Sequence, residues 1–547
     1  MTDSERTPEP QAPPLTLPEP VIHPHNLYLA YKRLQRASDP LCVDRLRLYE
    51  LGQGRERDIR SRMETLHIAF TAAAWRPSPP LYIYERKTTG VDRVKPRLTL
   101  LDALIYQAIA NLIPPLLAAR GAGREGREGE APRVSYSSIL TADAARGLEL
   151  VTGEAGGEPF TYFMFEPYYP NWRAYKDAQL ACAAPPGGPE RWALNFDLSV
   201  CFDNINHHLL CERLEREVGL SEDVTRVLRA CLDTWQGSDS HATRGVGLPQ
   251  GLDASYLLGE LYLRGLDERL RALSGEGYAA MRYVDDVAVV TTSDERAREG
   301  ALGLRDGPLR ALAAYLRGLG LQVNPSKIKF RRIPPQEAPP APPSAPALSA
   351  AALSAAAPLA PAEELDLNAL LGARQGQLKQ LLSQARTALY HGTRGEGAHE
   401  RRGALAPFAA LALQVARAEE TLVAQSLRAL CRLAHDEALL ADLVGVAGAH
   451  PRSPCARYAV YHHVTRAVER DRAQVPHAEG ALLALCAVER AAPSSLGLMG
   501  LLELAQATRG GLTPEVAAEV AAHVGVELRA MPSFDAFYGA WLLKGEG

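Results

Sequence analysis

The chain has 547 residues, of which 46% are hydrophobic and 23% are charged, and its formal net charge is -4. This length exceeds what one hydrophobic core usually serves, so two or more domains are expected. The small net charge argues against a general, salt-sensitive coat of nucleic acid, although local basic patches remain compatible with it. The eight cysteines include no C-x-x-C pair, so neither a zinc ribbon nor a disulfide framework is indicated.

The N-terminal residues 1–25 are rich in proline and acids, and we expect them to form a disordered tail. A secretory signal would need a basic start and an unbroken apolar stretch instead. We also expect no membrane-spanning segment, because the nearest candidate, residues 347–360, is alanine with interspersed Pro and Ser. A cytoplasmic protein without a membrane partner is therefore predicted.

The middle of the chain mixes strand and helix patterns. Residues 119–133 are rich in glycine and charge and predict a surface loop. Residues 191–198, "RWALNFDL", alternate apolar and polar side chains, which is typical of a half-buried strand that carries Asp197 on its polar face. Residues 205–219 and 221–235 predict helices. The region is therefore α+β.

The stretch "MRYVDDVAVVTT", residues 281–292, places adjacent carboxylates at the tip of a predicted hairpin. Asp285 and Asp286 repel each other and raise each other's pKa unless a cation neutralises them. A solvated turn is the ordinary explanation for such a pair taken alone. If Asp197 lies on a neighbouring strand, however, three carboxylates converge and could hold two Mg²⁺ for phosphoryl transfer.

A Pro/Ala-rich stretch, residues 333–364, predicts a semi-rigid linker. Beyond it, residues 365–547 read almost entirely as helix: apolar residues recur at the helical period over 367–389, and Ser453-Pro454 and Thr513-Pro514 are typical helix starts. An all-α, repeat-like domain of stacked antiparallel helices is predicted, although no clean internal period is found.

Four short motifs follow one another along the chain: "DLSVCF" from Asp197, "GVGLPQGLDAS" from Gly245, "YVDD" from Tyr283 and "GLQVNPSK" from Gly320. They occur in the order and approximate spacing of palm motifs A to D of reverse transcriptases. The chain resembles this family over roughly residues 80–332. The resemblance implies an α+β right-hand polymerase, with fingers and an N-terminal helical region in 26–190 and the palm in 191–332, followed by the all-α C-terminal domain.

The resemblance also assigns the reaction chemistry. Asp197 and Asp285 would be the principal metal ligands, Leu198 would add its backbone carbonyl, and Asp286 would support them. The cofactor would be two Mg²⁺, with Mn²⁺ as the alternative ion. Lys327 matches the motif D lysine, which is proposed to protonate the leaving pyrophosphate.

Other matched residues would contact the nucleotide. Phe202 matches the aromatic gate that excludes a 2′-hydroxyl, which implies dNTP use, although an ordinary core aromatic is the plain alternative. Gln250, Gly251 and Tyr283 would border the nucleotide and template base. The chain segment upstream resembles a basic fingers hairpin followed by a helix.

In that hairpin, Lys95 and Arg97 are the candidates for a triphosphate clamp. Separately, Gly251, Ser255 and Gly259 recur every fourth residue and predict a bare stripe on a helix. Such a stripe permits close approach of a nucleotide. Tight packing of the helix on a sheet explains it equally well.

No ribonuclease H, integrase or H-N-H nuclease segment is recognised after the palm. Residues 165–184 resemble the segment before motif A in abortive-infection and unknown-group bacterial reverse transcriptases. This resemblance implies a phage-defence polymerase and a homo-oligomer, with template-independent or protein-primed synthesis as variants. Its nucleic-acid partner would be an RNA template or a single-stranded DNA product, with a non-coding RNA as a further candidate.

Three alternatives stay open from the residues themselves. The first is a polymerase that uses rNTPs, against which Phe202 argues. The second is an inactive palm whose helical domain binds a partner protein, against which the intact aspartates argue. The third is a metal nuclease, which would need neither the Gln250-Gly251 pair nor the aromatic gate.

Overall fold

The structure is a computed structural model. It describes residues 14–37, 39, 41–86, 92–121, 133–152, 161–185, 188–235, 245–335, 402–418, 422–430, 437–470, 475–492 and 494–508. The chain divides into two compact units: Met1–Tyr82 with Lys95–Pro343, and Ile83–Val94 with Ser344–Gly547. The break after Pro343 falls inside the predicted linker, of which residues 336–364 lie outside the described part.

The predicted N-terminal tail is wrong for residues 14–25. Leu15 exchanges two backbone hydrogen bonds with Trp75, of 2.8 and 2.9 Å. The short helix α1 (Glu19–Ile22) follows, and its Val21 is fully buried. Proline is tolerated in the first turn of a helix, and the apolar residues between these prolines are drawn into the core. Residues 1–13 lie outside the described part.

The N-terminal part of the chain consists of helices and one hairpin, of which Ile83–Val94 belong to the second unit. They are α2 (Pro24–Leu34), α3 (Arg45–Leu51), α4 (Glu56–Ala72), β1 (Leu81–Arg86), β2 (Asp92–Arg97), α5 (Leu100–Asn111), α6 (Ile113–Ala119), α7 (Ala142–Thr152) and α8 (Tyr168–Ala181). By length and composition, the apolar run Leu100–Ala119 could cross a membrane, contrary to our expectation that no segment could, yet 78% of it is buried inside the fold. It is therefore explained as a core helix pair.

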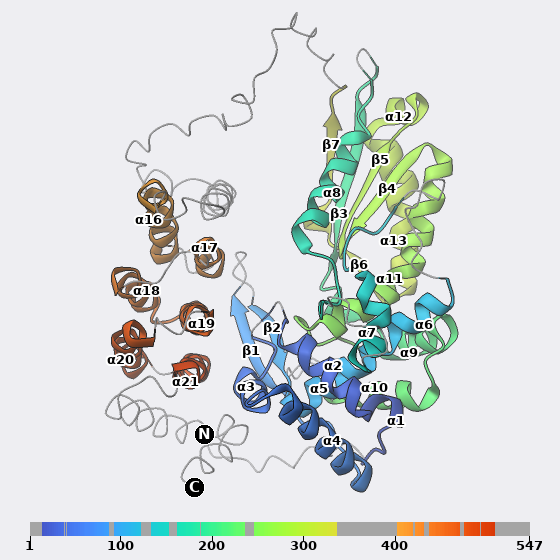
Figure 1. Cartoon of the computed structure of the whole chain (residues 1–547). Helices are drawn as coiled ribbons and strands as arrows, with labels where there is room; N and C mark the ends of the chain where they lie inside the picture. The colour runs from blue at the N-terminus through green and yellow to red at the C-terminus, as the bar shows by residue number, and fades with distance from the viewer. Residues whose placement is uncertain are drawn as a thin grey trace, which may run out of the picture. The chain divides into compact units, whose positions relative to one another are not determined.

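The palm sheet has five antiparallel strands. These are β3 (Arg191–Ser199), β4 (Tyr278–Tyr283), β5 (Asp286–Thr291), β6 (Gln322–Val323) and β7 (Lys329–Ile333). The order is β4-β5-β3-β6, and β7 also pairs with β3. The predicted strand at 191–198 and the hairpin at 279–291 are therefore confirmed, and they are direct neighbours (Figure 1).

Helices cover both faces of this sheet (Figure 1). Leu194, Phe196 and Leu198 of β3 belong to the main core, which includes residues of α9 (His207–Arg213), α10 (Glu222–Trp235), α11 (Asp253–Leu273), α12 (Asp294–Leu304) and α13 (Arg310–Gly318). On the other face, Tyr283 packs in a separate cluster with Tyr175 of α8. The helices predicted at 205–219 and 221–235 are confirmed, the first as α9 with a π-helical turn, Leu214–Val218.

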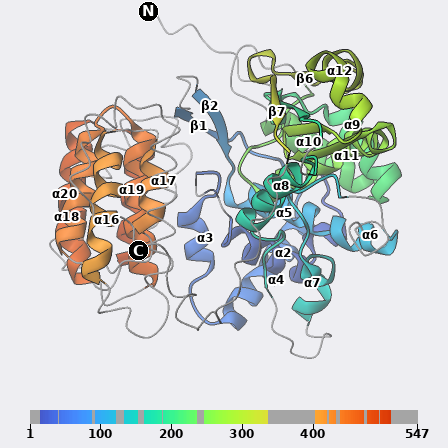
Figure 2. The same cartoon turned by 90° about the horizontal axis from the view of Figure 1, so that it is seen from above.

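The described part of the second unit beyond residue 401 is helical (Figures 1 and 2). Its helices are α16 (Arg402–Ala418), α17 (Val423–Leu430), α18 (Glu437–Ala449), α19 (Pro454–Arg470), α20 (Val475–Ala491) and α21 (Ser495–Thr508). Ser453 caps α19 through the Ala456 N–H at 3.4 Å, as predicted. The predicted helix at 367–389 and the cap at Thr513 lie outside the described residues.

Candidate active site

The end of β3 and the tip of the β4–β5 hairpin meet at one place. The strand register pairs Asp197 directly with Asp286. The Leu198 N–H donates a hydrogen bond of 3.1 Å to the Asp285 carbonyl. Residues about ninety positions apart in the sequence thus lie side by side, because the two strands are neighbours in one antiparallel sheet.

These carboxylates disfavour each other's ionisation. Burial, together with the charges of Asp197 and Asp286, raises the pKa of Asp285 to about 7. Burial and Asp197 also raise the pKa of Asp286, while Lys176 and Lys327 partly offset this. A divalent cation held between such groups would reverse the direction of these shifts, because it favours the charged carboxylates.

Lys327 lies in the same site. Its Nζ is 2.9 Å from Oδ2 of Asp197. Burial alone lowers the pKa of Lys327, but the hydrogen bond and charge of Asp197, helped by the hairpin aspartates, raise it above its usual value. The Asn324 N–H donates a hydrogen bond of 2.8 Å to the Asp197 carbonyl. This bond fixes the turn that carries Lys327 beside β3.

Asp197 and Asp285 lie close together, but the described part of the chain does not assemble a complete set of metal ligands around them. Among the residues that the structure describes, no three His, Cys, Asp or Glu side chains converge so as to hold a metal ion. Without a cation the carboxylates repel, and the amino group of Lys327 neutralises Asp197 instead. The donor chemistry nevertheless fits Mg²⁺, which prefers carboxylate oxygens: Asp197, Asp285 and Asp286 are the residues that would hold it.

The motif B turn departs from the prediction. Helix α11 begins at Asp253, so Gly251 precedes it and lies in a turn with φ of 103°. A Cβ at Gly251 would collide with Sγ of Cys42 and would lie 3.0 Å from Oδ2 of Asp39. The Cys42 thiol donates a 2.8 Å hydrogen bond to the Gln250 carbonyl. The turn is therefore packed tightly against the segment around residue 42.

The other two members of the predicted stripe serve helix packing. The buried hydroxyl of Ser255 hydrogen-bonds the Tyr106 hydroxyl at 2.9 Å. A Cβ at Gly259 would lie 3.4 Å from the Phe202 ring. Phe202 is half-buried, and its ring meets that of Tyr256 edge-on at 5.5 Å. Packing, the alternative stated above, explains both positions, and the gate role of Phe202 stays a prediction.

The predicted fingers clamp is engaged internally. Lys95 Nζ is 2.5 Å from Oδ2 of Asp39, and Lys95 is buried. Because Asp39 also lies against Gly251, β2 is connected to the motif B turn. Arg97 is fully buried, so the prediction that it offers its guanidinium to a triphosphate is wrong for this arrangement.

Tyr283 does not face an open nucleotide site. Its ring is covered by α8, where Trp172 and Tyr168 meet it edge-on with centroid distances of 4.9 and 5.3 Å. Its hydroxyl donates to the Tyr168 carbonyl at 3.4 Å. The aromatic residues of α8 pack on this apolar face of the sheet, and the nucleotide contact of Tyr283 stays a prediction.

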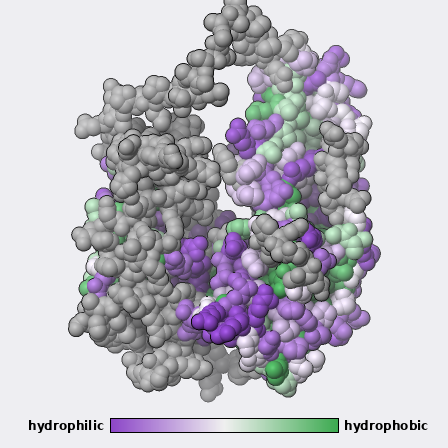
Figure 3. Space-filling model, in the orientation of Figure 1, coloured by the Kyte–Doolittle hydropathy of each residue, from purple (hydrophilic) through white to green (hydrophobic). Residues whose placement is uncertain are grey.

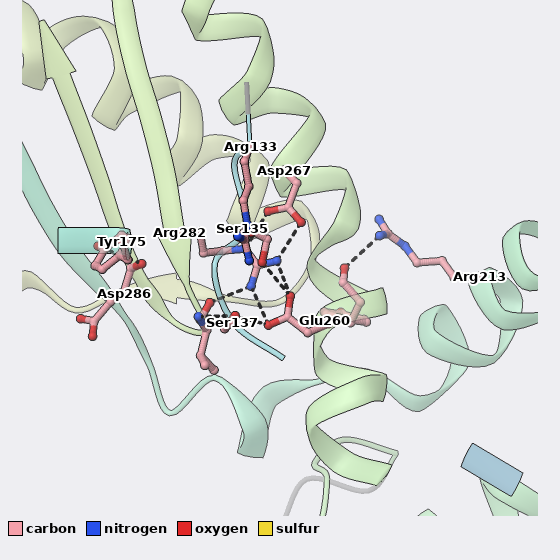
Figure 4. A network of polar contacts seen from close by, with 11 residues as sticks. Arg133, Ser135, Ser137, Tyr175, Arg213, Glu260, Asp267, Arg282 and Asp286 are labelled. Atoms are coloured by element: carbon pink, nitrogen blue, oxygen red, sulfur yellow. Dashed lines mark hydrogen bonds and ion pairs between the residues drawn. The ribbon is translucent and has the colours of Figure 1, made fainter. Parts of the chain in front are cut away.

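Sequence reasoning missed a buried charge network behind the hairpin (Figure 4). Arg282 is fully buried, and its guanidinium donates 2.7 Å hydrogen bonds to both oxygens of Asp267 and to Oε2 of Glu260. Burial alone lowers the pKa of Arg282, but Asp267 and Glu260 raise it well above its usual value. The available signal was an arginine inside an apolar strand and two acids seven residues apart on a leucine-rich helix.

Comparison with protein families matches residues 163–359 to reverse transcriptase (RNA-dependent DNA polymerase). The matched segment contains all four motifs, so residues 163–359 are similar to the reverse transcriptase family. The α+β fold of the described residues in this segment agrees with that similarity, and the described region beyond residue 401 is helical. No curated protein matches the chain.

Solved structures with similarity include telomerases. Apo telomerase from Candida tropicalis, truncated from its C-terminal domain, is 14% identical over 47% of this chain and 51% of that chain, with a TM-score of 0.30. Telomerase from the same organism with a TWJ fragment of telomeric RNA is 12% identical over 78% of this chain and 69% of that one, with a TM-score of 0.31. Telomerase from Candida albicans with a TWJ fragment of telomeric RNA is 12% identical over 74% of this chain and 64% of that one, with a TM-score of 0.28.

Proposed function

We propose that the reverse transcriptase domain of this chain extends nucleic acid by two-metal transfer of dNTPs. The observation that carries the proposal is the strand register that sets Asp197 against the hairpin aspartates, with Lys327 at the same carboxylate. When bound, two divalent ions would activate the attacking 3′-hydroxyl and stabilise the leaving pyrophosphate. Mg²⁺ is the proposed ion, with Mn²⁺ as the alternative.

Lys327 is the proposed acid of this reaction. Its raised pKa keeps a proton on Nζ at neutral pH. In the structure, Nζ is paired with Oδ2 of Asp197, the same carboxylate that would bind a cation. The Lys327 ammonium therefore lies beside a carboxylate that would hold the cation, where it could donate its proton to the leaving pyrophosphate.

The proposed dNTP preference depends on Phe202. This residue begins the turn that follows β3, and its ring lies against α11 at Tyr256 and Gly259, which limits its room to move aside for a 2′-hydroxyl. If the ring is instead only a core residue, the enzyme would accept rNTPs. Incorporation of dNTPs and rNTPs in parallel by the wild-type chain and Phe202→Ala distinguishes these cases.

The nucleic-acid partner is proposed to lie on the α8 face of the palm sheet. There Lys176 Nζ lies 4.4 Å above the Trp172 ring, and Arg331 of β7 hydrogen-bonds Gln179 of α8 at 2.8 Å. Tyr168 is 63% exposed. Aromatic rings interleaved with cations suit a single strand, which binds by stacking and phosphate contacts. The visible surface of this unit is otherwise mainly hydrophilic (Figure 3).

We further propose an antiviral role for this chain in the bacterial cytoplasm. The resemblance of residues 165–184 to abortive-infection and unknown-group enzymes supports it. In the C-terminal unit, α16 contacts α18, α17 contacts α19, α18 contacts α20, and α19 contacts α21, which supports a repeat-like stack. Homo-oligomerisation and template-independent or protein-primed synthesis are parts of the same proposal.

The test uses the full-length chain with Mg²⁺ and each labelled dNTP or rNTP, with and without added RNA or DNA. Asp285→Asn should lower incorporation at least about 100-fold, the scale for loss of one group that stabilises transition-state charge. Asp306→Asn, a fully exposed acid, is the matched control. Nuclease and protease digestion then show whether label stays on the protein. Incorporation that survives Asp285→Asn would refute the site.

A further inference from the structure

The tip of the catalytic hairpin has an unusual backbone conformation. Val284 has φ of 53°, in the left-handed region. Side chains branched at Cβ avoid this region, because Cβ crowds the following carbonyl. A valine adopts it only where its surroundings hold the backbone in place. The contacts around Val284 therefore show what fixes the tip.

Two side chains hold the peptide groups on either side of Val284. The Val284 N–H donates a 2.8 Å hydrogen bond to Oγ of Ser137. The Val284 carbonyl accepts one of 2.9 Å from Nη1 of Arg282. Asp285 is the next residue, and its own carbonyl accepts from the Leu198 N–H at 3.1 Å. The backbone is thus fastened both before and after the Asp285 side chain.

The two clamping side chains share one anchor (Figure 4). The Ser137 hydroxyl donates to Oε1 of Glu260, and Arg282 Nη2 donates to Oε2 at 2.7 Å. Asp267 takes the remaining side of the Arg282 guanidinium. Glu260 and Asp267 come from the long helix α11. The network therefore fixes the position of the hairpin tip relative to this core helix.

This arrangement is hard to explain by stability alone. A buried ion pair or triad is often no more stabilising than apolar side chains of similar volume, because removing charges from water is costly. The network does make two contacts that apolar residues could not make, namely the hydrogen bonds to the Val284 N–H and carbonyl. Its specific effect is therefore on the position of the tip.

We propose that Ser137, Arg282 and Glu260 are positioning residues that hold Val284 in the left-handed conformation and so aim Asp285 at Asp197. The inference rests on the proposed function, since it concerns the same carboxylates. If the clamp is loosened, Val284 relaxes to negative φ and the Val284–Asp285 peptide turns. The Asp285 carboxylate then no longer faces Asp197, and cation binding and turnover weaken together.

The decisive variant is Ser137→Ala, which removes one oxygen atom. Ser135→Ala is the matched control, because Ser135 also donates to Glu260, at 3.2 Å, and lies in the same segment but has no hydrogen bond to Val284. We expect Ser137→Ala to lower kcat about 10-fold, the scale for one hydrogen bond to a charged group, and to leave the KM for dNTP unchanged. Ser135→Ala should leave both nearly unchanged.

A second substitution tests the conformational step itself. Glycine adopts positive φ without steric cost. In Ser137→Ala/Val284→Gly the tip should therefore keep its conformation without the hydroxyl, and most of the lost kcat should return. A purely structural role for the network predicts no such rescue. It predicts instead that Ser137→Ala and Ser135→Ala lower Tm alike, with unchanged kcat per folded molecule, and that result would overturn the proposal.

Cation binding gives a readout that does not require catalysis. Mn²⁺ affinity, measured by electron paramagnetic resonance without nucleotide, should fall about 10-fold in Ser137→Ala and not in Ser135→Ala. If the wild-type chain binds Mn²⁺ in this pattern but incorporates no nucleotide, the proposed function fails and the positioning role stands. If the chain incorporates nucleotide while Ser137→Ala behaves as Ser135→Ala does, the positioning role fails and the function stands.

Discussion

Two of the turns that border the candidate site reach positive φ in different ways. The motif B turn uses Gly251, with φ of 103°, whereas the hairpin tip uses Val284, with φ of 53°. The glycine needs no help with its conformation but is confined by Cys42 and Asp39 around it. The valine has no such freedom, and it is held by a buried arginine and a serine hydroxyl. The residue type at position 251 is therefore restricted by the space around it, whereas the conformation of Val284 is maintained by hydrogen bonds.

The largest expected effect comes from removing the hairpin's main contact. Arg282→Met leaves Glu260 and Asp267 buried without their cation, which should cost about 3–5 kcal/mol of unfolding free energy. Chemical denaturation of the full chain measures it. Arg296→Met removes an arginine whose ion pair with Glu299 is at the surface, and it should cause no measurable change. Equal losses in both variants would contradict the buried-network account.

The next effect concerns the space around the motif B turn. Gly251→Ala adds both a positive-φ penalty and a collision with Cys42, and it should lower the unfolding free energy by about 2–3 kcal/mol. Gly245→Ala has the same φ penalty, at φ of 80°, but nothing lies within 4 Å of its new Cβ. It should therefore lose only about 1 kcal/mol. If both variants lose the same unfolding free energy, crowding by Cys42 does not destabilise Gly251→Ala.

A smaller effect is expected beside the motif B turn, where Asp39 pairs with Lys95 of β2. Asp39→Asn removes the charge that holds Lys95, at 2.5 Å, and leaves the segment beside Gly251 nearly unchanged in shape. If Lys95 binds the triphosphate, KM for dNTP should fall about 2- to 5-fold, the range of a modest ion pair. Lys95→Met should raise KM. Steady-state incorporation measures both, and a KM that rises in Asp39→Asn would exclude the clamp.

A further effect is expected on the pH dependence of stability without metal. Because the pKa of Asp285 is raised to about 7, the native state retains a proton that the unfolded chain loses near pH 4. Stability from this group is therefore present below pH 4 and lost as pH rises through 7. Tm should fall over this window more steeply in the wild-type chain than in Asp285→Asn, and Mg²⁺ should remove the difference. Parallel curves would contradict the assignment.

Much of the palm could be predicted from sequence because its signals are local. Alternation over residues 191–198 and the apolar runs around Asp285 specify strands, and the four motifs specify their order. Helix N-caps such as Ser453 are equally local. These features depend on neighbours within a few positions, so the pattern alone contains them.

Contacts between distant segments could not be predicted. Ser137 and Val284 are 147 positions apart, and Asp39 and Lys95 are 56 positions apart. The local sequence around one member of each pair does not indicate which residue it contacts. The burial of Tyr283 under α8 and of Arg97 in the core has the same origin, since exposure depends on how the helices pack. The prediction of disorder was wrong for residues 14–25, because it followed their high proline and acid content and gave no weight to the apolar residues that are buried.

Helix α8 affects the electrostatics of the hairpin as well as its packing. Its first turn contains Tyr168, whose ring meets that of Tyr283 at the catalytic hairpin. The amino end of a helix carries partial positive charge from its aligned peptide dipoles. This end of α8 lies beside Tyr283, and the ammonium of Lys176 from the same helix partly offsets the raised pKa of Asp286, which reduces the energetic cost of gathering carboxylates at the hairpin.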